Sequence, residues 1–293
     1  MAIASMNRRP GWGWALLQFP LTRIVLFASV VLAGIVFAQS SKLLGIAPHS
    51  MAAAIFSLLV VALSVVLYCV FVRLIERRQI TEFARAHWAK DFGTGILIGT
   101  LLFTVTMAVL ILFGAASLGF SGNWSALAYT FAGALVAAVM EEVLLRGVLF
   151  RIIEESLGSW IALGLSALVF GALHAFNPGA TLASTMAIAL EAGVLLAAVY
   201  MYTRTLWMPI GLHLGWNFTE GGIFGASVSG GEANGWLTSH LQGPDLLTGG
   251  AFGPEASLVA VLVCLTAGAA FLALAVRRQH VVAPFGNWGQ SRL

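Results

Sequence analysis

Long apolar stretches, separated by short polar connections, run along most of the chain. About eight of them have roughly the 20 residues that an α-helix needs to cross the hydrocarbon of a bilayer. The pattern predicts an all-α fold: a polytopic transmembrane helical bundle in a single integral-membrane domain over residues 1–293. The expected spans lie near residues 22–40, 52–74, 93–115, 126–150, 159–176, 181–203, 206–226 and 256–276.

The composition agrees with burial in lipid. Hydrophobic residues make up 59% of the sequence and charged residues only 9%, a balance that ordinary soluble domains do not have. The formal net charge is +3, but the basic residues flank the apolar stretches instead of forming a patch. We therefore expect the lipid bilayer as a partner and no binding of nucleic acid.

The basic residues also predict the orientation of the chain, because Lys and Arg accumulate in cytoplasmic loops. With Arg8 and Arg9 inside, only Lys42 falls clearly outside. The first apolar run, residues 24–37, is interpreted as a retained span, although a cleavable signal peptide is the alternative. We expect a multi-pass protein of the cell (plasma or inner) membrane with both termini cytoplasmic. The other basic residues then inside include Arg23, Arg73, Arg77, Arg78, Arg85, Lys90, Arg151, Arg204, Arg277 and Arg278.

Two connections carry further signals. Residues 75–92 mix charges with apolar side chains, a pattern that fits a short helix in the headgroup layer or a solvated connector equally well. Residues 227–254 are rich in glycine and contain the turn signals Gly243-Pro244 and Gly253-Pro254. This second segment is predicted to be an outer loop.

Charged residues inside the predicted fourth span indicate function. A charge at the centre of a spanning helix costs roughly 2.5–3.5 kcal/mol on insertion scales, so such residues usually face the bundle interior. Glu142 and Arg146 are four residues apart and can pair on one helix face. Glu141 points about 100° away from Glu142, so its carboxylate is predicted to stay available.

Two further spans each present a pair of candidate site residues at helical spacing. Phe170 and His174 share one face of the fifth span, and His213 and Asn217 share one face of the seventh. Together with Glu141, these groups suffice for hydrolysis of a peptide bond. We expect Glu141 and His174 to activate a water molecule, and His213 and Asn217 to stabilise the oxyanion.

The same segments carry three motifs in order: EExxxR at Glu141, Glu142 and Arg146, FxxxH ending at His174, and HxxxN ending at Asn217. In these motifs the chain resembles the CPBP family of membrane proteases, which includes CAAX prenyl proteases and bacteriocin-processing proteases and is also called the ABI family. The likeness covers residues 126–220. It implies an intramembrane endopeptidase that acts on a membrane-associated or lipid-modified protein or peptide.

The resemblance also implies a set of site residues. The first motif glutamate and the motif histidines line an intramembrane cavity in the family, which corresponds to Glu141, His174 and His213, with Asn217 beside them. Family members have been described as glutamate-dependent proteases and as metalloproteases. The helical zinc motif HExxH is absent, so we expect catalysis without a cofactor. The alternative is a zinc ion held by the same Glu and two His side chains.

Some polar residues have structural interpretations. Glu142 and Arg146 are predicted to support the site as a buried pair, and Phe170 to shape its wall. Glu191 and Glu220 have no partner evident in the sequence; a structural role is favoured, while substrate binding and proton relay stay open. The alternatives to an enzyme are a non-catalytic immunity or scaffold protein and a transporter, whose inverted repeats are not found.

Overall fold

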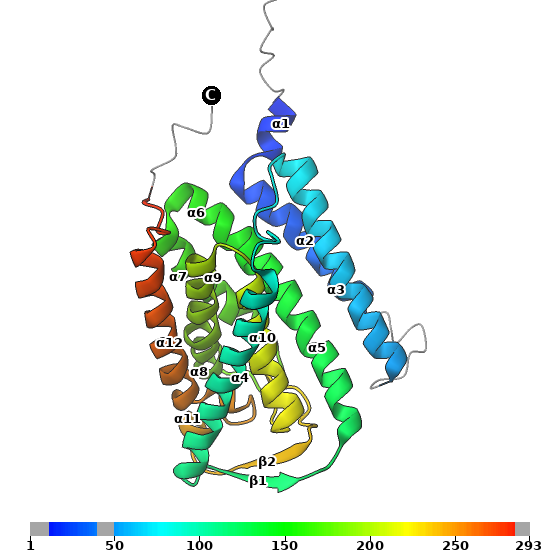
Figure 1. Cartoon of the computed structure of the whole chain (residues 1–293), viewed down its shortest axis with the longest axis vertical. Coiled ribbons are helices and arrows are strands. Elements are labelled where there is room, and N and C mark those ends of the chain that lie inside the picture. The colour runs from blue at the N-terminus through cyan, green and yellow to red at the C-terminus, as the bar shows by residue number, and fades with distance from the viewer. Residues whose placement is uncertain (1–11, 40–49, 285–293) are drawn as a thin grey trace, which may run out of the picture.

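The structure is a computed structural model, and it describes residues 12–39 and 50–284. Each of the predicted spans is helical in it, so the prediction of an all-α membrane bundle is confirmed (Figure 1). The first half of the bundle consists of α1 (Trp12–Leu17), α2 (Pro20–Gln39), α3 (Met51–Phe71), the π-helical turn η1 (Val72–Glu76) and α4 (Trp88–Leu112).

The second half contains three more π-helical turns, each of which continues a helix. It consists of α5 (Trp124–Glu142), η2 (Val143–Phe150), α6 (Arg151–Leu157), α7 (Ser159–His174), α8 (Leu182–Ile188), η3 (Ala189–Gly193), α9 (Val194–Thr203), α10 (Trp207–Asn217), η4 (Phe218–Ile223) and α12 (Leu258–Arg277).

Four helical segments are long and apolar enough to cross a membrane. Large apolar side chains stay exposed on them: Leu97 and Leu101 of α4 keep 67% and 57% of their surface. Such exposure is costly in water and favourable in lipid, which agrees with a membrane protein. The number of spans stays a prediction. The four segments are Ala52–Glu76, Trp88–Leu112, Leu182–Thr203 and Leu258–Arg277.

Helices α4 and α10 pack closely, and glycines allow this approach. A Cβ atom added at Gly99 of α4 would lie 2.1 Å from the carbonyl oxygen of Leu212, and one at Gly215 of α10 would lie 2.3 Å from that of Ile96. Small residues at a helix interface bring two backbones together within a membrane. This contact fixes the position of α10, which carries two of the predicted catalytic residues.

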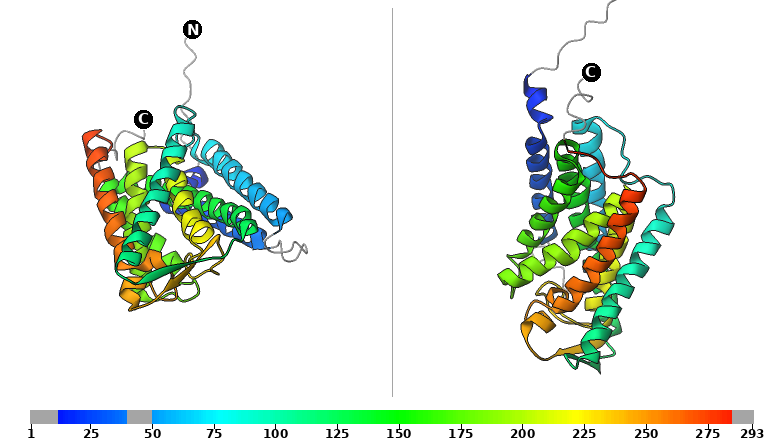
Figure 2. Two further views of the ribbon diagram at one scale, coloured as in Figure 1. Left: turned by 60° about the horizontal axis from the view of Figure 1, so that its bottom comes forward. Right: turned by 90° about the vertical axis from the view of Figure 1, so that its left-hand side faces the viewer.

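A two-stranded antiparallel sheet crosses one end of the bundle (Figure 2). Strand β1 (Ala116–Phe120) follows α4, and β2 (Leu237–Leu241) lies in the predicted outer loop, with Phe120 opposite Leu237. The sequence analysis expected no strand in either place. The same loop region contains α11 (Asp245–Thr248) and the 3₁₀ turn η5 (Pro254–Ala256).

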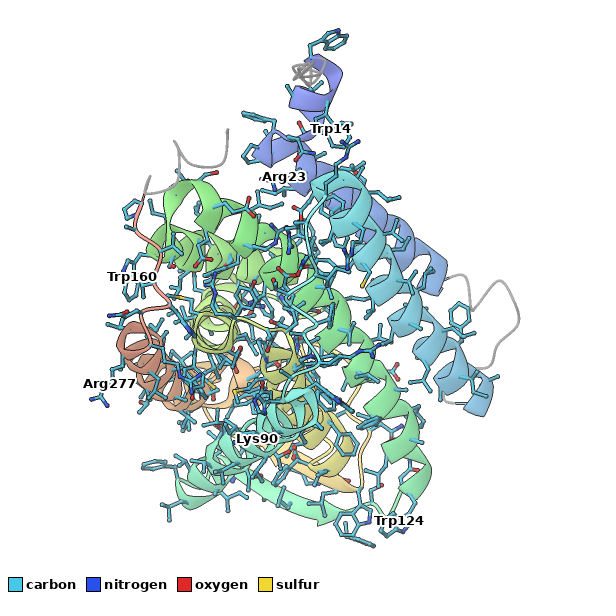
Figure 3. All side chains as sticks on the ribbon, turned by 45° about the horizontal axis from the view of Figure 1, so that its top comes forward. Trp14, Arg23, Lys90, Trp124, Trp160 and Arg277 are labelled. Atoms are coloured by element: carbon cyan, nitrogen blue, oxygen red, sulfur yellow. The ribbon has the colours of Figure 1, made fainter. Side chains whose placement is uncertain are left out.

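Basic residues gather at the other end of the bundle. Figure 3 shows Trp124, at the start of α5, at the opposite end from Trp14 and Arg23. Arg23 and Arg151 both contact Glu76 at the end of η1. The helix ends are therefore arranged as the positive-inside prediction requires, while the side of the membrane that each end faces stays a prediction.

The connection between η1 and α4 agrees with the connector and not with the short helix among its two predicted forms. Residues 77–87 contain no helix, and most of them are exposed. The backbone N–H of Leu206 donates to the carbonyl of Glu82, and the indole N–H of Trp207 donates to that of Ala84, both at 2.9 Å. Phe83 packs edge-on against Trp207. The connection is thus an irregular segment anchored to the start of α10.

Candidate active site

A cavity of about 220 Å³ lies among α5, α7, η3, α9 and α10. Residues 228 and 229, in the segment before β2, and Glu255 in η5 also line it, so the cavity extends to the loops that follow η4. All four residues that the sequence nominated for catalysis line this single cavity, although they come from three separate helices. They are Glu141, His174, His213 and Asn217.

Glu141 stands in the last turn of α5, with its side chain 32% exposed. Its Oε2 atom lies 4.0 Å from Nε2 of His213. Within the part of the chain that the structure describes, this buried oxygen has no hydrogen-bond partner. A carboxylate oxygen in this state is available to accept a proton.

Glu142 and Arg146 form the buried pair that their spacing predicts. Nη1 of Arg146 donates to Oε1 of Glu142 at 2.7 Å, and both side chains are fully buried. Nη2 of Arg146 donates to the carbonyl of Gly193 in η3 at 3.0 Å. The pair therefore ties the segment after α5 to the π-helical turn that forms another wall of the cavity.

Glu142 has a second contact that the sequence analysis did not foresee. Its Oε1 atom lies 3.3 Å from Nδ1 of His213. An ionised carboxylate only accepts hydrogen bonds, so Nδ1 carries the proton and Nε2 is the ring nitrogen directed at Glu141. Glu142 thus sets the orientation of a candidate catalytic ring, in addition to its pairing with Arg146.

His174, the last residue of α7, is oriented by its own helix. Its Nδ1 atom lies 2.8 Å from the carbonyl oxygen of Phe170. A carbonyl can only accept, so Nδ1 is the donor and Nε2 of the neutral ring keeps a lone pair. The ring also stacks on Phe170, with centroids 4.8 Å apart and planes inclined by 19°.

Phe170 joins the motif residues to one another. The ring is buried, and besides His174 it faces the guanidinium carbon of Arg146 at 4.9 Å and the ring of His213 at 6.1 Å. Ring-to-ring and cation–π contacts of this kind restrict how each ring rotates and how far it moves from its neighbours. Phe170 is therefore placed to hold the two imidazoles in a fixed relation.

Asn217 is the last residue of α10 and precedes the π-helical turn η4. Its side chain lines the cavity, and it makes no hydrogen bond to another described residue. Short π-helical turns recur at functional sites because they redirect a side chain from the regular helical face. Here the free carboxamide can donate into the cavity.

Two carboxylates that lie outside the motifs also line the cavity. Glu191 belongs to η3, and its Oε1 atom accepts from the thiol of Cys264 at 3.4 Å. Glu255 in η5 accepts from the backbone N–H and hydroxyl of Ser229 at 2.8 and 2.7 Å. Burial raises the pKa of the Glu255 carboxyl, and donation by Ser229 opposes this rise without cancelling it.

The sequence identified Glu191 as unpaired but gave no reason to consider Glu255. The only local signal is its position directly before the last apolar stretch. Glu220 does not line the cavity: its Oε2 atom accepts from the indole N–H of Trp216 at 3.0 Å. Its other oxygen is buried without a partner among the described residues.

The described residues were also considered as metal ligands. In residues 12–39 and 50–284, no three His, Cys, Asp or Glu side chains are arranged to hold one metal ion. Glu141, His174 and His213 line the same cavity but do not form such a group in this arrangement. The choice between catalysis without a cofactor and a zinc site stays a prediction, and no step below depends on a metal.

Comparison with known families agrees with the motif analysis. Residues 122–219 match the family described as Rce1-like, type II CAAX prenyl endopeptidase Rce1-like. This part of the chain is Rce1-like. The expected resemblance to the CPBP family is confirmed, and the Rce1-like segment contains all three motifs.

No curated protein and no solved structure matches the chain. The resemblance of this segment implies an intramembrane endopeptidase of the CAAX type. It agrees with the predicted protease activity. The substrate and the residues that perform the chemistry belong to the proposal that follows.

Proposed function

We propose that this protein is a glutamate-dependent intramembrane endopeptidase that hydrolyses a peptide bond of a membrane-associated or lipid-modified substrate. The observation that supports it most is the convergence of Glu141, His174, His213 and Asn217 on one cavity. Each of these polar groups is expensive within a membrane helix, and a shared reaction accounts for their meeting.

Glu141 and His174 activate the water molecule in this proposal. The free Oε2 of Glu141 and the lone pair of His174 Nε2 are both acceptors, so one water can donate a hydrogen bond to each. Its oxygen lone pair is then directed at the substrate carbonyl. As the C–O bond forms, Glu141 takes the water proton and the carbonyl oxygen becomes an oxyanion.

His213 and Asn217 stabilise this oxyanion. The Asn217 carboxamide donates as it stands, whereas His213 donates from Nε2 only when its ring carries both protons. Two carboxylates flank that ring, with Glu142 at Nδ1 and Glu141 at Nε2. When the tetrahedral intermediate collapses, the C–N bond breaks and Glu141 delivers its proton to the leaving amine.

The proposal places the reaction in a multi-pass protein of the cell membrane with both termini cytoplasmic. The gathering of basic residues at one end of the bundle supports this orientation. The surrounding apolar helices exclude bulk water, so the hydrogen bonds to the oxyanion act in a low dielectric.

A direct test compares purified wild-type protein with Glu141→Gln on a membrane proteome, with new peptide termini read by mass spectrometry. Wild type should generate a defined set of termini that the variant does not. Equal sets would contradict the proposal. A parallel reaction with a strong chelator tests the metal alternative: undiminished cleavage agrees with catalysis by the protein groups alone, and abolished cleavage restorable by zinc overturns it.

A further inference from the structure

The cavity has an acidic wall, defined here as Glu191 and Glu255. Both side chains are 3% exposed and line the same cavity as the four candidate catalytic residues. No Lys or Arg is among the described residues that line it. With Glu141, the cavity presents three carboxyl groups, and their charge is not balanced by a permanent cation of the protein.

The partners of the acidic wall are neutral. Glu191 accepts from a thiol, which is a weak donor, at 3.4 Å. Glu255 accepts from the backbone and hydroxyl of Ser229. Arg146 of the first motif is already engaged by Glu142 and by backbone carbonyls of η3. Among the described residues, the protein thus supplies no Lys or Arg to the acidic wall.

A third carboxyl group adjoins the acidic wall. Glu220 is fully buried, and no N–H or O–H group of the described residues donates to its Oε1 atom. Its carboxyl interacts with that of Glu255 through a hydrogen bond as well as electrostatically, and with Glu191 electrostatically. A buried oxygen without a donor from the rest of the protein is rare and calls for a ligand or a proton. The three carboxyl groups therefore form one acidic region beside the cavity.

We infer that Glu191 and Glu255 bind a cationic side chain of the substrate, the ammonium of Lys or the guanidinium of Arg, close to the peptide bond that is cleaved. The inference rests on the proposed function, because it needs the substrate backbone beside Glu141. A long basic side chain reaches the acidic wall while its backbone stays at the catalytic groups. A bare metal ion fits less well, since no three side chains here are arranged to hold one.

This binding makes the acidic wall a determinant of specificity. A basic side chain gives the buried carboxylates the charged partner that they lack, whereas a neutral side chain of the same length leaves them unpaired. We therefore expect kcat/KM to be at least about tenfold higher for a Lys substrate than for its norleucine counterpart. Arg against citrulline should show the same preference.

The new termini that wild-type protein generates identify a cleavage site, and a peptide that spans this site serves as the substrate. The peptide and the protein are reconstituted together in vesicles. Lys or Arg within two residues of the cleaved bond is replaced by norleucine or citrulline, and the ratio of kcat/KM values is measured. The ratio is then measured for Glu191→Gln and Glu255→Gln. The matched control is Glu232→Gln, which changes an exposed carboxylate in the outer loop.

The wild-type ratio should be about ten or more, each acidic-wall variant should lower it toward one, and Glu232→Gln should leave it unchanged. A wild-type ratio near one, or cleaved bonds without any nearby basic residue, overturns the inference but not the proposed function. Cleavage that persists in Glu141→Gln overturns the proposed function instead. If an acidic-wall variant does not fold, the wild-type ratio alone decides.

Discussion

The bundle contains two groups of charged residues. In one group the carboxylates are paired with arginines, and in the other they are not. At the basic end, each buried carboxylate has an arginine partner. We call this set of residues the inner-end network. In the cavity, Glu191 and Glu255 have neutral partners, and Glu141 has a free oxygen. The inner-end network consists of Arg23, Glu76, Arg78, Glu82, Arg151, Glu154, Glu155 and Arg204.

Glu76 shows how completely the inner-end network is paired. Its carboxylate is contacted by Arg23 at 3.1 Å, Arg78 at 2.9 Å and Arg151 at 2.5 Å. These arginines come from α2, from the connection after η1 and from α6, so one carboxylate joins three segments. Burial would lower the pKa of Arg204 in the same network, but the hydrogen bonds and charge of Glu154 outweigh burial and raise it.

The difference between the two groups separates structural charges from functional ones. A partly buried carboxylate that is fully paired lowers the energy of one arrangement of helices. A buried carboxylate that lacks a charged partner destabilises the fold, and such residues persist where a substrate or a proton is the partner. The predictions below test this division, beginning with the largest expected effect.

Glu141→Gln should remove activity while the fold remains. Replacing a general base lowers turnover by about 10²–10⁴-fold. Because Oε2 makes no described hydrogen bond within the protein, the thermal unfolding midpoint should stay close to that of wild type. Peptide cleavage in vesicles and thermal unfolding in detergent measure the two quantities. An unfolding midpoint lowered as much as that of Arg146→Met would show that Glu141 is structural.

Arg146→Met should destabilise the protein strongly. The substitution leaves Glu142 as an unpaired charge in a fully buried position, which costs about 3–5 kcal/mol. The double variant Glu142→Leu/Arg146→Met should recover much of this stability, since it removes both charges. It should not recover activity, because His213 loses the acceptor at Nδ1. Recovery of both would show that the pair acts only through packing.

The sequence predicted the helices and the contacts within them. Long apolar runs define the spans, and the spacing of four residues brings Glu142 to Arg146 and Phe170 to His174 on one helix face. Both contacts are observed, because helical geometry alone determines them. The convergence of separate helices on one cavity was expected from the polar residues inside the spans and from the family motifs.

Contacts between helices were beyond the reach of the sequence. The contact of Glu142 with His213 depends on how α5 and α10 cross, and the arrival of Glu255 in the cavity depends on the fold of a long loop. The pairing of β1 with β2 joins two short segments far apart in the chain, with no alternating pattern to indicate it. The π-helical turns around the cavity also break the regular helical period on which the sequence analysis relied.

Glu76→Gln tests the inner-end network. The amide keeps the shape of the side chain but removes the charge that three arginines share. Arg23 and Arg151 are buried and Arg78 is partly exposed, and we expect a loss of about 1–3 kcal/mol in the free energy of unfolding. Cleavage per folded molecule should stay unchanged, in contrast to Glu141→Gln. A fall in turnover per folded molecule that accompanies the loss of stability would mean that the two groups of charges are coupled.

Phe170→Leu should have the smallest effect and should separate ring positioning from stability. Leucine keeps most of the buried apolar surface but loses the stacking on His174, and such an aromatic contact contributes about 0.5–1.5 kcal/mol. If this contact holds the imidazole in place, kcat should fall by up to about tenfold.

The matched control is Phe150→Leu. Phe150 is equally buried and packs edge-on against Tyr200, away from the cavity, at a centroid distance of 5.4 Å. Both variants should lose a similar amount of stability in thermal unfolding, because each loses one buried aromatic contact. Only Phe170→Leu should lower kcat. Equal kinetic losses in the two variants would mean that the stack on His174 contributes to packing alone and that another contact fixes the ring.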